Sequence, residues 1–170
     1  MMKKFSIFIS IVIVSVVIGI FTYIKVSNPL LMDGFSSTYL KPNDTYDITF
    51  GFYNEGLRAI QIEEVFINGK AGEGTVDLGI SFDTLQMVQP GSRNPNTLFF
   101  PLQEKTVNPK LTNSEVTEAL NKGVMTPLLY GIRVKDYIGT IETLSIQYKY
   151  LGLTVTKQYE INKDFVLDEE

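Results

Sequence analysis

Hydrophobic and polar positions follow two patterns along this chain. Residues 5–24 read FSIFISIVIVSVVIGIFTYI and contain no charged side chain. As a helix this stretch would span roughly 30 Å, the hydrocarbon thickness of a bilayer. From about Phe35 onward, apolar and polar residues alternate, and turn residues recur about every 8–12 positions, a spacing typical of an all-β sandwich or barrel. The chain therefore divides into an apolar N-terminal segment and a β-rich remainder.

The N-terminal segment predicts an uncleaved transmembrane helix over 5–24. Its apolar core is longer than the roughly 7–15 residues of a secretory signal, and no small-x-small cleavage site follows it. A cleaved signal peptide and a buried soluble helix are the alternatives. Lys3 and Lys4 precede the segment and Lys25 follows it, which favours a cytoplasmic N-terminus and an extracytoplasmic C-terminal domain.

The expected organisation has three parts. A membrane anchor occupies 1–25, a short stalk containing Pro29 and Gly34 occupies 26–34, and an extracytoplasmic β-sandwich domain occupies 35–170. The protein is thus expected in the cell membrane as a single-pass protein.

Alternation in the third part predicts about seven or eight strands and one short helix. A strand is expected over 46–53, and the next strand shifts its apolar parity at Glu63-Glu64, which predicts a β-bulge. Two shorter strands are expected over 75–88 and a further strand over 97–102.

Two local sequence signals predict particular elements in the second half of the domain. Thr112 and Glu115 form a capping box, so a short helix should begin there, end at Gly123 and cover one end of the sandwich. A hairpin with a two-residue loop at Leu151-Gly152 sorts nearly all apolar residues onto one face. Leucine fits a type I′ turn poorly, so a longer loop is the alternative.

Three short stretches carry a family resemblance: Leu40-x-Pro42-Asn43-Asp44, Phe52-x-Asn54-x-Gly56 and Ile67-Asn68-Gly69. Their layout resembles the immunoglobulin-like, CARDB-type accessory domains of bacterial surface proteins. The resemblance implies a sandwich that serves as a spacer or a binding module, and it brings no catalytic residues with it.

Composition removes several classes of chemistry. The chain has 170 residues and no Cys, His or Trp, so it has no disulfide, no thiolate zinc site and no histidine-based triad. Its 15 basic and 19 acidic residues give a net charge of −4. Three of the basic residues flank the apolar segment, so the region after Lys25 has 12 basic and 19 acidic residues, a net charge of −7. This acidity argues against nucleic-acid binding.

The remaining candidates for chemistry are few, and we expect no catalytic residue and no cofactor. Gly69-x-x-Gly72-x-Gly74 reads as a hairpin loop and not as a phosphate-binding loop. The carboxylates available for glycoside hydrolysis are Glu63, Glu64, Asp77 and Asp83, and those available for a calcium site are Asp44, Asp47 and Asp77. The tyrosines that could bind a partner, most of which alternation assigns to the core, are Tyr53, Tyr130, Tyr137, Tyr148, Tyr150 and Tyr159.

These observations favour a non-catalytic, membrane-anchored binding or accessory module of the bacterial envelope. Its expected partners are the membrane, through the N-terminal helix, and another envelope protein. Two alternatives remain: a small envelope enzyme that uses carboxylates or a Ser-Lys pair, and a structural spacer. A large exposed apolar patch would favour the binding module, whereas converging carboxylates in a cleft would favour the enzyme.

Overall fold

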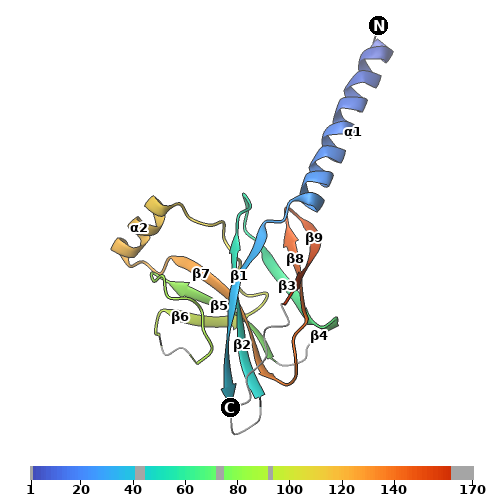
Figure 1. Cartoon of the computed structure of the whole chain (residues 1–170). Helices are drawn as coiled ribbons and strands as arrows, with labels where there is room; N and C mark the ends of the chain where they lie inside the picture. The colour runs from blue at the N-terminus through green and yellow to red at the C-terminus, as the bar shows by residue number, and fades with distance from the viewer. Residues whose placement is uncertain (1, 41–44, 72–74, 92–93, 162–170) are drawn as a thin grey trace.

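The computed structural model describes residues 2–40, 45–71, 75–91 and 94–161. Helix α1 (Met2–Val26) is followed by a mostly β region with two antiparallel sheets and one short helix, α2 (Asn113–Lys122) (Figure 1). The first sheet contains, in spatial order, β1 (Leu30–Leu40), β2 (Thr45–Asn54), β7 (Pro127–Tyr137), β5 (Thr75–Phe82) and β6 (Thr97–Pro101). The second contains β4 (Lys70–Ala71), β3 (Gln61–Ile67), β8 (Thr143–Tyr150) and β9 (Leu153–Glu160). The described residues therefore form nine strands, slightly more than the sequence predicts.

One hydrophobic core lies between the two sheets. Ile48 and Ile132 from the first sheet are almost fully buried, and so are Leu144 and Ile146 from the second. Alternation along these strands sends the intervening residues outward, as the sequence predicts. The core holds the sheets together face to face and leaves an outer face on each.

Several local predictions are confirmed. The register of β3 on β8 shifts between Ile62 and Glu64, where the bulge was expected. The β8–β9 hairpin has its two-residue loop at Leu151-Gly152, so the longer loop is wrong. The capping box at Thr112 is present, and Gly123 ends α2 in the left-handed conformation.

The structure also differs from the sequence-based expectations. Residues expected to form a stalk include the first part of β1, because Leu30 is buried in the core and pairs with Asn54. Only one strand forms between 75 and 88, and the chain after Phe82 runs as an irregular segment. Helix α2 covers little of the domain end, because Ala119 is its only buried residue.

Helix α1 projects away from the two sheets, and only its last turns approach them (Figure 1). Ile24 belongs to the common core and is 3% exposed, whereas apolar residues further up the helix, such as Val14 and Ile18, are exposed. Among the described residues, no helix combines the length and the apolar character needed to cross a membrane.

Candidate functional site

The outer face of the five-stranded sheet carries a row of glycines. Gly51, Gly131 and Gly79 are direct register partners across β2, β7 and β5, so this row has no side chains. The segment of residues 83–91, which we call the strap, packs into the space that results. Val88 of the strap is 4% exposed, although it lies outside the main core. A Cβ on Gly79 would collide with Val88, and a Cβ on Gly131 would lie 3.0 Å from the Val88 Cβ.

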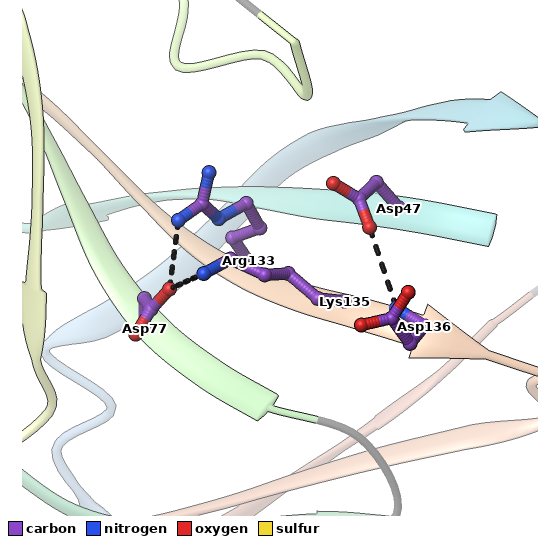
Figure 2. Close-up of polar contacts among 5 residues, drawn as sticks. All are labelled: Asp47, Asp77, Arg133, Lys135 and Asp136. Atoms are coloured by element: carbon purple, nitrogen blue, oxygen red, sulfur yellow. Dashed lines mark hydrogen bonds and ion pairs between the residues drawn. The ribbon is translucent and has the colours of Figure 1, made fainter. Parts of the chain in front are cut away.

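A cluster of charged side chains lies on the same face, two residues along β5 and β7 from the glycine row (Figure 2). Arg133 and Lys135 of β7 both donate to one oxygen of Asp77 on β5, at 2.7 and 2.8 Å. The Arg133 guanidinium also lies 3.4 Å from the centre of the Phe99 ring on β6. Partial burial raises the pKa of the Asp77 carboxyl, but hydrogen bonds from Lys135 and Arg133 and their charges outweigh burial and lower this pKa.

The charged groups of Asp77, Arg133 and Lys135 pair with one another. Asp47, which Figure 2 also shows, accepts a hydrogen bond from the backbone N–H of Asp136 at 3.3 Å. The cluster therefore cross-links β5, β6 and β7 on the outer face, which is a structural role.

A groove opens at the edge of the first sheet, on the inner side of edge strand β6. Its volume is about 370 Å³, and apart from Lys105, Thr106 and Asn108 its lining is apolar: Ile80, Phe82, Leu98, Phe100, Met125 and Pro127. This volume lies within the roughly 300–1,000 Å³ of small ligand sites. We call it the β6 groove. The rings of Phe82 and Phe100 meet edge to face in its wall, with centroids 6.5 Å apart.

The β6 groove exists because the second sheet does not extend over β6. The chain from 102 to 112 covers this part of the inner face instead, and its main anchor is Val107, which forms an isolated bridge with Ile60. The side chain of Leu98 points into the groove and remains 38% exposed. A single irregular segment thus leaves apolar side chains of the inner face accessible.

Met125 is held at the groove by strained backbone. Its φ is +58°, a conformation that bulky side chains rarely adopt. The Asp83 carboxylate fixes this turn by accepting from the backbone N–H groups of Met125 and Thr126, at 2.6 and 2.8 Å. The Met125 side chain is nevertheless 51% exposed. The fold therefore stabilises an unfavourable backbone conformation at a residue whose apolar side chain is exposed.

A second concavity on the outer face is much smaller. It measures about 90 Å³ and lies between the strap and the edge of the sheet, with Met87 and Leu129 on one side and Tyr53 and Lys110 on the other. The Lys110 ammonium sits 4.5 Å from the centre of the Tyr53 ring, which closes this side of the pocket. The pocket is well below the roughly 300 Å³ of the smallest typical ligand sites.

The carboxylates considered for catalysis are not brought together. Glu63 lies in the second sheet, where it pairs with Lys149 at 2.7 Å and accepts a hydrogen bond from Thr154. Asp77 lies near the start of β5 and Asp83 follows its last residue, so six steps of extended chain place them roughly 20 Å apart. Glu64 is exposed on β3.

The residues considered for a metal site and the tyrosines considered for partner binding do not form a site either. Within the described ranges, no group of three acidic, histidine or cysteine side chains could hold a metal ion. Asp44, Gly72 and Gly74 lie outside the described residues. Five of the six candidate tyrosines are buried, as alternation predicts: Tyr130, Tyr137, Tyr148, Tyr150 and Tyr159. Only Tyr53 is partly exposed, and it lines the small pocket.

Sequence reasoning did not find the β6 groove. The adjacent Phe99 and Phe100 were the available signal, because neighbouring strand residues face opposite sides. Phe99 lies on the outer face beneath Arg133, whereas Phe100 packs against the core and lines the groove. The incomplete cover over Phe100 depends on the path of the chain after Pro101, which has no periodic pattern.

Comparison with known proteins gives no match of any kind: no family model, no curated protein and no solved structure resembles this chain.

Proposed function

We propose that this protein is a membrane-anchored, non-catalytic binding module of the bacterial envelope. In this proposal, α1 holds the chain in the cell membrane, with the N-terminus in the cytoplasm. The two sheets form an extracytoplasmic, immunoglobulin-like sandwich of the kind that CARDB-type accessory domains have. This sandwich binds an extended segment of another envelope protein in the β6 groove.

The β6 groove is the observation that carries the binding role. It combines an apolar, aromatic lining with the free edge of β6, whose only partner strand among the described residues is β5. An extended peptide can pair its backbone with such an edge while placing alternate side chains in an adjacent hollow. The Lys105 ammonium, 5.0 Å from the centre of the Phe100 ring, adds positive charge at the rim. The expected partner segment thus has an apolar residue beside an acidic one.

The sequence and the conformation of α1 support the membrane anchor. Counted on the full sequence, residues 5–24 contain no charged side chain, and all of them are helical. Apolar side chains on every described side of this helix are exposed, for example Ile11, Val14 and Val17. A helix that is apolar all round requires an apolar environment. Lys3 and Lys4 on the short side support the proposed orientation.

Site-specific crosslinking in intact cells tests the binding role. A photo-reactive amino acid is placed at position 98, inside the groove. In a separate variant, which serves as the control, it is placed at position 138, where Ile138 is 72% exposed in the loop between β7 and β8. We expect one discrete adduct from position 98 and none from position 138. Met125→Arg, which places a charge at the groove, should abolish the adduct.

Two outcomes would contradict the proposal. Equal adducts from positions 98 and 138, or adducts that survive Met125→Arg, would show nonspecific contact. A stable, membrane-located chain that gives no adduct from position 98 would favour the spacer. Met125→Ala is the matched control for Met125→Arg, because it removes the side chain without adding charge and should weaken the adduct only partly.

A further inference from the structure

The turns beside α1 form one end of the two-sheet domain, which we call the anchor end. Leu30, the first residue of β1, pairs with Asn54, the last of β2, so the chain leaves β2 beside the end of α1. Gln61 at the start of β3 pairs with Lys149 near the end of β8, which places the 55–60 loop and the β8–β9 turn at this same end. Figure 1 shows the tips of β8 and β9 next to the base of α1.

Short connections fix the anchor end to α1. Only residues 27–29 separate α1 from β1, and the carbonyl of Pro29 accepts from the backbone N–H of Glu55 at 2.8 Å. The Tyr150 hydroxyl accepts from the backbone N–H of Leu57 at 3.1 Å, which joins the 55–60 loop to β8. Ile24 is buried in the common core, so the end of α1 packs directly against the two-sheet domain.

Each of these two loops presents a leucine to the surroundings. Leu57 is 79% exposed and Leu151 is 46% exposed. Arg58, also exposed, follows Leu57 directly. Exposed leucine and arginine side chains are compatible with a position at the boundary between lipid headgroups and acyl chains, although the same loop also exposes Glu55.

Leu151 adopts a backbone conformation that leucine rarely adopts. Leu151 and Gly152 have φ values of +51° and +82°, the two positive values of a type I′ turn. The chain contains a second two-residue turn of the same kind, Asn68-Gly69, with φ values of +50° and +77°. That turn uses the preferred Asn-Gly pair, and it lies at the opposite end of β3. Leucine replaces asparagine only at the anchor end, where its side chain remains 46% exposed despite the unfavourable conformation.

We propose that Leu57 and Leu151 enter the interface of the bilayer that holds α1 and so dock the domain end-on against the membrane. This inference rests on the membrane anchor proposed above. The short three-residue connection brings the anchor end to the membrane surface as soon as α1 is inserted. Docking fixes the direction of the sheets relative to the membrane and leaves the sides of the sheets, including the β6 groove, accessible to partners.

The natural absence of cysteine makes the test direct. Single cysteines at positions 57, 151, 138 and 14 of the full chain are labelled with an environment-sensitive fluorophore. The protein is reconstituted in phosphatidylethanolamine–phosphatidylglycerol vesicles with spin-labelled lipids. We expect headgroup-proximal spin labels to quench positions 57 and 151 and deep spin labels to quench position 14. Position 138, at the far end, should be quenched by neither.

The pattern of quenching separates the two proposals. No quenching at position 14 would overturn the membrane anchor and with it this inference. Quenching at position 14, with positions 57 and 151 behaving like 138, would leave the anchor intact and overturn end-on docking. End-on docking would also be overturned if positions 57 and 151 were quenched by spin-labelled lipids only when a second protein is present.

Leu151→Asn provides a readout that a structural role would not produce. Asparagine tolerates the positive φ, so the melting temperature should stay the same or rise. Quenching at position 57 should nevertheless decrease, because one of the two membrane contacts is lost. A lower melting temperature with unchanged quenching at position 57 would overturn the role of Leu151.

Discussion

Two buried tyrosines differ in whether their hydroxyl groups have a hydrogen-bond partner. Tyr148 and Tyr159 lie on neighbouring strands, and both are buried in the common core. The Tyr159 hydroxyl donates to the carbonyl of Leu30 at 2.6 Å, whereas the Tyr148 hydroxyl has no hydrogen-bond partner among the described residues. Burial, and then the nearby Tyr150, raise the pKa of Tyr148 to about 12, so its hydroxyl stays neutral at physiological pH.

Removing these two hydroxyls should have opposite effects. Tyr159→Phe leaves a buried carbonyl without its donor and should lower the free energy of unfolding by about 1–2 kcal/mol. Tyr148→Phe removes an unpaired polar atom and should leave this free energy unchanged or raise it. Urea denaturation of the two variants measures the difference. A larger loss for Tyr148→Phe than for Tyr159→Phe would contradict the hydrogen-bond assignment.

Asp77 gives the fold a defined dependence on pH. Its carboxyl has a lowered pKa in the folded state, so it contributes stability above its unfolded pKa of about 3.9, and this contribution is lost as the pH falls through the folded value. Lys135→Met should move the titration of Asp77, followed by NMR, to higher pH. Lys122→Met, which removes the exposed pair with Glu118 on α2, is the control and should leave Asp77 unchanged. Equal titrations in both variants would show that Lys135 does not hold Asp77.

Strands and turns with a local signal could be predicted from the sequence. The bulge at Glu63 and the whole register of the β8–β9 hairpin follow from the requirement that apolar residues share one face. The same holds for the start and end of α2, where Thr112 and Gly123 provide the caps. In each case, residues close in sequence determine the outcome.

The strap and the β6 groove could not be predicted in this way, because their cause lies between distant elements. Val88 has the apolar character of a strand residue, and the sequence therefore predicted a second strand there. Its actual position depends on two glycines, Gly79 and Gly131, that only meet once β5 and β7 are paired. The binding site proposed here likewise depends on where the second sheet stops.

The packing of the strap can be tested at the glycine row. Gly79→Ala should lower the free energy of unfolding by roughly 1–3 kcal/mol, because the new Cβ meets Val88 and lies 2.8 Å from the Phe99 ring. Gly51→Ala is the matched control in the same row. Its Cβ would have no neighbour closer than 3.7 Å, so this variant should be neutral or more stable by up to about 1 kcal/mol. Equal effects, measured by thermal denaturation, would contradict the packed strap.

At the scale of the whole molecule, the two ends of the domain differ. The anchor end presents Leu57 and Leu151 beside α1, whereas the far end carries the Asn68-Gly69 turn, in which Asn68 accepts from the backbone N–H groups of Glu142 and Thr143. The Asn68 side chain thus joins the far-end turn to the chain that leads into β8, while the anchor-end turn carries an exposed apolar side chain. The far end also exposes an apolar side chain, Ile138, so the two ends differ in the composition of their turns and not in the presence of apolar surface.

The central claim, a binding module held in the membrane by α1, is tested most directly by flotation of the full chain with lipid vesicles after alkaline carbonate extraction. We predict that the native chain floats with the vesicles. Val14→Asp combined with Val17→Asp should abolish flotation, because each charge at the centre of a membrane helix costs about 2.5–3.5 kcal/mol. Ile138→Asp, at an exposed isoleucine of the β domain, should float as the native chain does. Release of the native chain by carbonate, or equal flotation of the α1 variant, would contradict the account.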